Sequence, residues 1–147
     1  MATIEYQVMI QALPDKVYRI SQDYACRYDW DPFPEQIELL HNARDIAVGV
    51  QVKVVARNGL KMIVEFIQIA PPKTAAVAMV KGPFFLDKFA GSWIFSESNG
   101  QTLARFRYNL QAKPWARALL IEHLAVWYFT RAVRARLDGL KRYCESH

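Results

Sequence analysis

The stretch PWARALLIEHLAVWYFTRAVRARLDGLKRYC, residues 114–144, decides the fold. It opens on proline, which suits the first turn of a helix, and then continues with a single glycine. Mostly apolar side chains recur in it at steps of three and four residues, which is the spacing of one helix face. The members of this stripe are Trp115, Leu119, Glu122, Val126, Phe129, Val133, Leu137, Leu140 and Cys144. The spacing predicts one long helix, with Arg134, Arg136 and Lys141 mostly off the stripe.

The chain before this helix has the patterns of β-strands. Residues 3–12 alternate apolar and polar side chains, as a half-buried strand does, and Pro14 then begins a short helix. Six further strands are expected over residues 37–43, 49–57, 60–69, 74–80, 86–96 and 102–111. Asn58-Gly59 and Asn99-Gly100 are two-residue hairpin signals, so consecutive strands should pair in antiparallel fashion. A long helix with one apolar face must then pack on one face of a curved sheet.

Size and composition favour one globular domain over residues 1–147. Hydrophobic residues make up 52% of the chain and charged residues 22%, so global disorder is not expected. Cys26 and Cys144 form no CxxC pair or Cys/His cluster, which argues against a disulfide framework and a zinc site. The N-terminal residues do not have the pattern of a signal peptide. We therefore expect a cytoplasmic protein with no metal and no cofactor.

The formal net charge of +5 comes largely from the end of the chain. The basic residues there are Arg117, Arg131, Arg134, Arg136, Lys141 and Arg142. Such a face attracts nucleic acid, anionic lipid or an acidic ligand, or is a solvated helix face with no partner. No nucleic-acid-binding motif is recognisable, so DNA is not an expected partner. Transient contact with an anionic membrane or with another protein stays open, and the pattern does not set the oligomeric state.

Three motifs in this order resemble a known superfamily. They are ALPDKVYRISQDYACRYDWDPF at residues 12–33, GPF followed by GSWIFSESNGQTLARFRY at residues 82–84 and 91–108, and ARLDGLKRYCE at residues 135–145. The chain is similar to the START-like (SRPBCC) superfamily, in its polyketide cyclase/dehydrase-like branch. This resemblance implies an α+β helix-grip fold of the START/Bet v 1-like kind. In that fold two short helices follow the first strand, and a curved seven-stranded antiparallel sheet encloses an apolar cavity beneath a long C-terminal helix.

The resemblance also gives a role to YDWDPFPE, residues 28–35, which combines large rings with turn-forming residues. Its acids and prolines would shape a short turn at the mouth of the cavity, while its rings turn inward or simply fill the core. The full set of cavity candidates is Tyr28, Trp30, Phe33, Phe66, Trp93, Phe95, Phe106, Tyr108, Trp115, Leu119, Glu122 and Val126. Aromatic residues at strand spacing line a pocket or fill a core, and both interpretations stay open.

Glu122 is the most informative polar residue because a carboxylate on an apolar stripe must be paired, protonated or next to water. It would bind a ligand, act as a general acid or base, or reach the helix edge and solvent. The neighbouring His123 has no ligand-forming partner and is interpreted as structural. No GxSxG, Walker A or GxGxxG motif is present.

The leading hypothesis is a non-enzymatic protein that binds, and in one version transports, a small hydrophobic or amphipathic molecule such as a lipid, quinone or polyketide. The first alternative is a polyketide cyclase or aromatase that uses Tyr108, Glu122 and an inward-facing arginine. The second is an RNA- or protein-interaction module that uses the basic C-terminal helix. A packed domain without a cavity is the remaining possibility.

Overall fold

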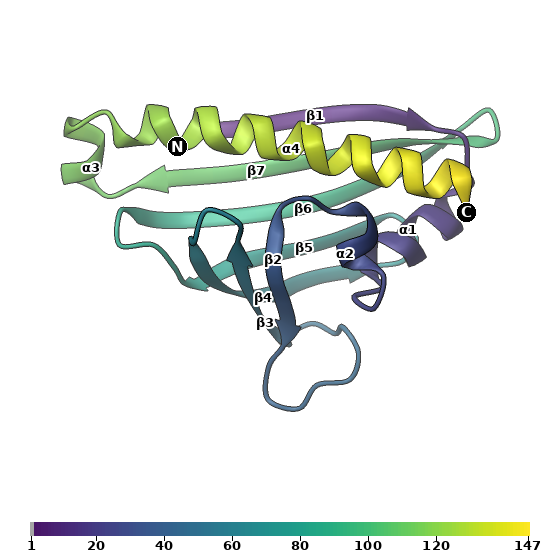
Figure 1. Ribbon diagram of the computed structural model, residues 1–147, viewed down its shortest axis with the longest axis horizontal. Helices are drawn as coiled ribbons and strands as arrows, with labels where there is room; N and C mark the ends of the chain where they lie inside the picture. Colours follow the sequence, from purple (N-terminus) through teal and green to yellow (C-terminus); the bar gives the residue numbers. More distant parts are fainter. Residues whose placement is uncertain (1) are drawn as a thin grey trace.

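The computed structural model describes residues 2–147 as one curled antiparallel sheet with a long helix lying across it (Figure 1). The strands follow the order β1-β7-β6-β5-β4-β3-β2. Their bounds are β1 Ala2–Ile10, β2 Pro34–Leu39, β3 Gln51–Ala56, β4 Lys61–Ala70, β5 Thr74–Lys81, β6 Leu86–Ser98 and β7 Gln101–Ala112. The helices are α1 Pro14–Gln22, α2 Arg27–Trp30, α3 Pro114–Ala118 and α4 Ile121–Ser146. This arrangement confirms the predicted helix-grip fold.

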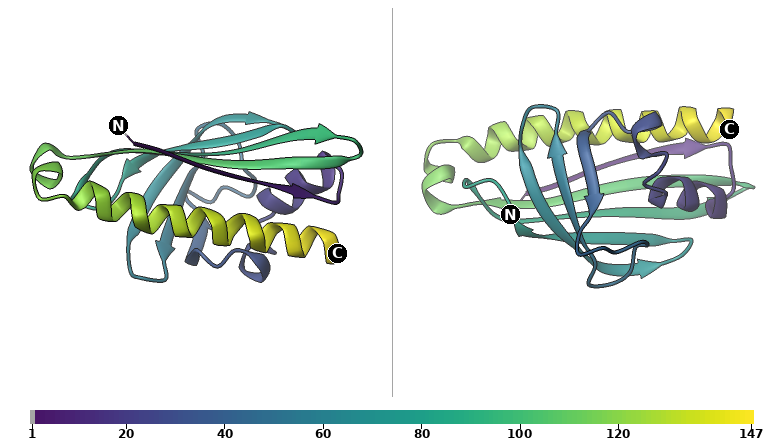
Figure 2. Two further views of the ribbon diagram at one scale, coloured as in Figure 1. Left: turned by 90° about the horizontal axis from the view of Figure 1, so that it is seen from above. Right: turned by 60° about the horizontal axis from the view of Figure 1, so that its bottom comes forward.

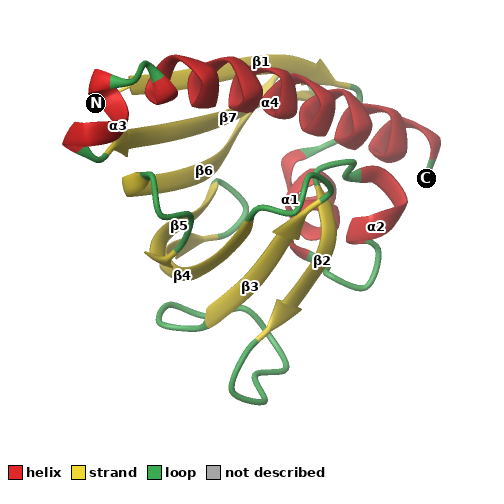
Figure 3. Cartoon of the chain, turned by 60° about the vertical axis from the view of Figure 1, so that its left-hand side comes forward, coloured by secondary structure: helices red, strands yellow, loops and turns green. Residues whose placement is uncertain are grey.

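The curvature of the sheet gives it one concave face, and α4 lies over the side of this face formed by β1 and β7 (Figure 3). Neighbours in the chain pair as hairpins from β2 to β7, and β1 joins the sheet beside β7. The helices α1 and α2 lie towards the C-terminal end of α4, as two further views show (Figure 2). Helix α4 packs on β1 and β7, so the N-terminal strand and the C-terminal helix lie next to each other.

Alternation on β6 and β7 directs the aromatic side chains to the concave face, as predicted. Trp93 pairs in register with Phe106, and Gly91 pairs with Tyr108. The rings of Phe106 and Tyr108 lie directly over Gly91, so that a Cβ atom on Gly91 would be only 3.3 Å from each of them. Glycine at this position thus makes room for two rings on the neighbouring strand.

Two turn predictions have different outcomes. Asn99 and Gly100 both take positive φ angles, 53° and 78°, and form the two-residue turn that the dipeptide predicts. At Asn58-Gly59 only the glycine is left-handed, with φ of 93°, and residues 57–60 make a longer loop. The side-chain oxygen of Asn58 accepts a hydrogen bond from the N–H of Leu60 at 3.1 Å. The predicted two-residue hairpin there is wrong, because asparagine stabilises the loop from its side chain instead.

The strand predicted over residues 37–43 is shifted. The observed β2 spans Pro34–Leu39 and ends before His41 and Asn42, whose φ angles of 57° and 60° cannot continue a strand.

The single long helix predicted from Trp115 is wrong, because it is broken at Leu119 and Leu120. Leu120 has a left-handed φ of 61°, so α3 ends and α4 begins in a new direction. Trp115 and Leu119 consequently leave the predicted stripe and are 44% and 66% exposed. Beyond the break the stripe is confirmed, and its buried members are Phe129, Val133, Leu137, Leu140 and Cys144. In the part of the chain that the structure describes, no helix is long and apolar enough to span a bilayer.

Helix α4 also contains a very close backbone approach in the core, at Gly139. A Cβ atom at this position would overlap the carbonyl oxygen of Trp30 in α2. Because Gly139 has no side chain, the backbone of α2 packs directly against α4. This contact sets the position of the segment that follows α2.

We predict that Gly139→Ala destabilises the protein by about 1–3 kcal/mol, although alanine is the better helix former. The added methyl group must push α2 away from α4. Urea unfolding followed by circular dichroism measures the change. An unchanged or increased free energy of unfolding would show that the contact between α2 and α4 is loose.

Candidate ligand-binding site

A cavity lies between the concave face of the sheet and α4. The space open to the centre of a water molecule is about 80 Å³, and about 10–15 Å³ of such space holds one water. Most of the wall is apolar and comes from strands β2 to β7. The lining residues are Gln22, Tyr24, Arg27, Phe33, Pro34, Ile37, Val52, Val54, Ala56, Leu60, Met62, Val64, Phe66, Val77, Phe89, Gly91, Trp93, Phe106, Tyr108, Phe129 and Arg136.

One end of this cavity is polar because Arg136 of α4 turns inward. Its Nη1 donates a hydrogen bond to the Tyr108 hydroxyl at 2.7 Å. Its Nε and Nη2 donate to Oδ2 of Asp31 at 3.1 and 2.9 Å. Arg136 is 8% exposed and Asp31 is 1% exposed, so the ion pair is buried. Buried charges are tolerated when they are paired and hydrogen-bonded, as they are here.

The position of Asp31 follows from local sequence. It is the residue after α2, and its Oδ1 accepts a hydrogen bond from the backbone N–H of Phe33 at 3.0 Å. Arg27 lies one helical turn earlier and its Nη1 is 3.4 Å from Asp31 Oδ2. A second Arg27 nitrogen donates to the backbone carbonyl of Ser21. The interpretation of Asp31 as turn chemistry is therefore right but incomplete, since the same carboxylate also binds two arginines.

Aromatic rings surround the Arg136 guanidinium. Its central carbon lies 5.0 Å from the ring centre of Phe33, 5.2 Å from that of Trp93 and 4.9 Å from that of Phe106. Ring faces carry partial negative charge and attract a cation, more strongly where water is excluded. The rings thus fix the orientation of the arginine that the ion pair anchors.

Burial and hydrogen bonding set the protonation states at this end of the cavity. Burial alone would lower the pKa of Arg136, but Asp31 and Tyr108 outweigh it, so that pKa is raised and the guanidinium stays charged. Burial raises the pKa of Tyr108, and the nearby Arg136 only partly opposes this. Tyr108 is therefore a protonated phenol at neutral pH, which accepts a hydrogen bond from Arg136 and has a proton of its own to donate.

Five of the predicted cavity residues lie on its wall. They are Phe33, Phe66, Trp93, Phe106 and Tyr108. The structure brings them together from the segment after α2 and from strands β4, β6 and β7. Their contact with a ligand stays a prediction.

The other seven predicted residues lie off the wall. Trp30 and Phe95 are buried in the core, where Trp30 packs edge-on against Trp93 at 5.8 Å between ring centres. Tyr28 is 50% exposed, and its hydroxyl makes hydrogen bonds with the backbone of Ile37 on the edge strand β2.

The remaining four sit on α3, its end or the start of α4. Trp115 and Leu119 point to solvent because of the helix break, and Val126 is half-buried outside the cavity. Glu122 is half-buried in the first turn of α4, and its Oε1 makes no hydrogen bond within residues 2–147. Glu122 is therefore not among the residues that line this cavity, and of the alternatives that the sequence left open the position at the helix edge fits best.

The sequence analysis allowed for an inward-facing arginine but did not identify Arg27 or Arg136 as the arginines that make the polar end. The predicted stripe leaves Arg136 out, yet this residue follows Val133 by three positions and Phe129 by seven, which is the spacing of the buried face. Arg27 and Asp31 have the i,i+4 spacing of a helical ion pair. Both signals were present, but basic and acidic side chains are seldom fully buried.

Comparisons with known proteins agree with this architecture. A family described as "Polyketide cyclase / dehydrase and lipid transport" matches residues 1–145. No curated protein matches the sequence of the chain.

Several solved structures are similar over nearly the whole chain. Protein TTHA0849 of Thermus thermophilus is 19% identical, with a TM-score of 0.81 over 99% of this chain and 98% of that one. Protein XoxI of Bacillus cereus is 14% identical, with a TM-score of 0.78 over 97% and 95% of the two chains. Norcoclaurine synthase of Thalictrum flavum, solved in complex with dopamine and hydroxybenzaldehyde, is 14% identical, with a TM-score of 0.75 over 99% and 87%. These likenesses establish the shared fold.

We predict that Asp31→Asn destabilises the protein by about 3–5 kcal/mol, because it leaves buried arginines without a counter-charge. The matched control is Glu5→Gln, which removes a carboxylate that is 33% exposed and pairs with Arg107 at 3.1 Å. This exposed pair should be worth less than about 1 kcal/mol. Urea unfolding of both variants gives the comparison. Equal losses in the two variants would contradict a special role for the buried pair.

Proposed function

The chain belongs to the polyketide cyclase/dehydrase and lipid transport family, and we propose that it binds a small hydrophobic or amphipathic molecule in the cavity beneath α4. The observation that carries this proposal is the division of the cavity into an apolar wall and one buried polar end. Transport of the bound molecule is part of the same proposal. Location in the cytoplasm stays a prediction from the unpaired Cys26 and Cys144.

The apolar wall supplies the affinity in this proposal. Aliphatic side chains of β3, β4 and β5, among them Val52, Val64 and Val77, would cover the body of the ligand. Burial of apolar area contributes about 25 cal/mol per Å², from which the cost of immobilising the ligand must be subtracted. A lipid, a quinone or a polyketide all offer such a body.

The polar end supplies orientation. Arg136 and Tyr108 present donor groups to any oxygen at that end of the ligand, and the ion pair to Asp31 holds them in place. A donor that is already positioned discriminates against ligands with no oxygen there, because its hydrogen bond would be left unmade. The ligand therefore enters with its oxygen towards α4 and α2.

An enzymatic role remains the second candidate, and Tyr108 favours it. A protonated phenol in a cavity can donate to a carbonyl oxygen as negative charge develops there. Arg136 would stabilise the same charge. Glu122 lies off the cavity wall, so a cyclase mechanism would have to use these two groups without it. The description of the family includes cyclases, and turnover that Tyr108→Phe abolishes in a folded protein would favour the enzyme.

We predict that native mass spectrometry of freshly purified protein detects a discrete added mass that is lost on denaturation. Val77→Phe, which fills the cavity from β5, should remove this mass while circular dichroism stays unchanged. The matched control is Ile67→Phe on β4, where the side chain is 53% exposed and lies off the cavity wall. Bare chain mass in wild type over several preparations would count against a stable carrier.

A further inference from the structure

The cavity wall carries two arginines, Arg27 and Arg136, and among the described residues that form it there is no carboxylate. The carboxylate that pairs with them, Asp31, lies behind the wall, and both guanidinium groups contact the same oxygen, Oδ2. One negative charge is therefore shared by two positive charges. The buried group has an excess of one positive charge on the side that faces the cavity.

Arg27 is the less well satisfied of the two arginines. It is 2% exposed, and its Nε makes no hydrogen bond within residues 2–147. Its contact with Asp31 is 3.4 Å, whereas Arg136 approaches the same oxygen to 2.9 Å. A buried donor without an acceptor, in a buried group with excess charge, is costly unless an anion completes it.

We propose that the ligand of this cavity carries a single acidic group, a carboxylate in the simplest case, which binds between Arg27, Arg136 and Tyr108. This inference rests on the proposed function and narrows it to amphipathic acids. The apolar part of the ligand lies along β3, β4 and β5, and the acidic oxygens accept hydrogen bonds from the arginines. The Tyr108 hydroxyl, which already accepts from Arg136, donates its proton to the same group.

The test compares two compounds of the same shape by isothermal titration calorimetry at neutral pH, 3-phenylpropanoate and the uncharged 3-phenylpropanamide. We expect the acid to bind at least about tenfold more tightly, because hydrogen bonds to an ionised acceptor are the stronger ones. Arg27→Gln should remove most of this preference. The control Arg142→Gln, an exposed arginine on α4, should keep it.

The outcomes separate this inference from the proposed function. Equal affinity for acid and amide in the wild-type protein would overturn the acidic ligand and leave the binding function standing. An acid preference that survives Arg27→Gln would overturn the role of Arg27. Binding of neither compound would also overturn the inference, and the native mass spectrum would then decide separately on the binding function.

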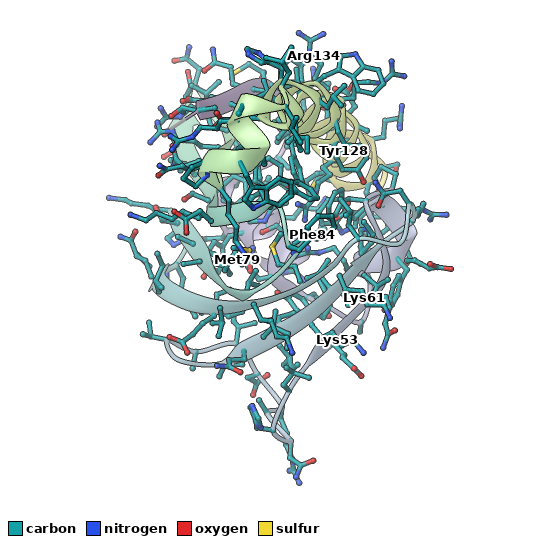
Figure 4. The ribbon with its side chains drawn as sticks, turned by 90° about the vertical axis from the view of Figure 1, so that its left-hand side faces the viewer. Lys53, Lys61, Met79, Phe84, Tyr128 and Arg134 are labelled. Carbon is teal, nitrogen blue, oxygen red and sulfur yellow. The ribbon has the colours of Figure 1, made fainter. Side chains whose placement is uncertain are left out.

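A separate surface carries a second inference. Six large apolar side chains at the α3 end of the molecule are 44–74% exposed. This surface, called the tryptophan end, consists of Phe84, Trp115, Leu119, Leu120, Leu124 and Trp127. Phe84, labelled in Figure 4, comes from the loop between β5 and β6. Its ring stacks on that of Trp115, with 5.7 Å between the ring centres. Leu120 is the residue just before α4, and Leu124 and Trp127 lie three residues apart on the exposed side of α4. Large exposed apolar patches mark interaction sites.

The charges around the tryptophan end favour an anionic partner. The tryptophan end lies within residues 81–88 and 113–131. The basic residues of these segments are Lys81, Lys88, Lys113, Arg117 and Arg131, and their acidic residues are Asp87 and Glu122. Arg131 lies over the ring of Trp127 at 5.2 Å. A second copy of the chain would bring these basic side chains face to face. An anionic lipid surface would neutralise them while tryptophan and leucine enter its interface.

We infer that the tryptophan end docks on an anionic membrane surface. Sedimentation with phosphatidylcholine vesicles, with and without phosphatidylserine, tests this. We expect binding only when phosphatidylserine is present, and a loss of about tenfold in the double variant Leu124→Ser, Trp127→Ala. Ile67→Ser, another exposed apolar residue on β4, is the control and should bind as wild type. Binding to neither vesicle, or dimerisation that the double variant abolishes, would overturn the inference.

Discussion

The buried ion pair between Asp31 and Arg136 is the constraint on which the rest of the site depends. It joins the segment after α2 to the middle of α4, two parts of the chain that are far apart in sequence. Two charges removed from water are costly, and the cost is offset only when nearly all their hydrogen bonds are made. Here Arg136 uses three nitrogens, while Asp31 also accepts from Phe33 and contacts Arg27. Gly139 makes this arrangement possible by letting α2 lie against α4.

The ion pair and the sheet together explain why the cavity has two kinds of wall. Strand alternation directs aliphatic side chains of β3, β4 and β5 to the concave face. Helix α4 packs on β1 and β7 and so leaves space above these aliphatic side chains. At the polar end of the cavity the guanidinium of Arg136 packs against three aromatic rings, those of Phe33, Trp93 and Phe106. The result is an apolar space that ends in a fixed array of donors, which suits a molecule with an apolar body and one oxygen-bearing end.

Much of the fold could be predicted because it depends on short-range periodicity. The alternation on β1, β6 and β7 and the stripe from Phe129 to Cys144 are repeated signals, and each was correct. The break at Leu120 could not be predicted in the same way, since no glycine or proline marks it and leucine seldom takes a left-handed φ. That one residue explains why Trp115 and Leu119 were misplaced.

The site was harder to predict than the fold because its decisive residues contradict composition rules. Arg136 lies at a buried spacing on α4, but an arginine is ordinarily assigned to solvent. Asp31 has the local role expected of an aspartate before proline, and its second role depends on a helical residue that lies 105 positions later in the chain. Such a pairing is a tertiary contact that no local pattern contains.

A crystal structure of the protein with 3-(4-bromophenyl)propanoate would show most directly whether a ligand lies in the cavity with its acidic end at the arginines, since anomalous scattering locates the bromine independently of the rest of the ligand. We expect the bromine among Val52, Phe66 and Val77, and the carboxylate within hydrogen-bonding distance of Arg27 or Arg136. A ligand bound in the opposite direction, with bromine beside the arginines, or bound only outside the cavity would contradict this placement.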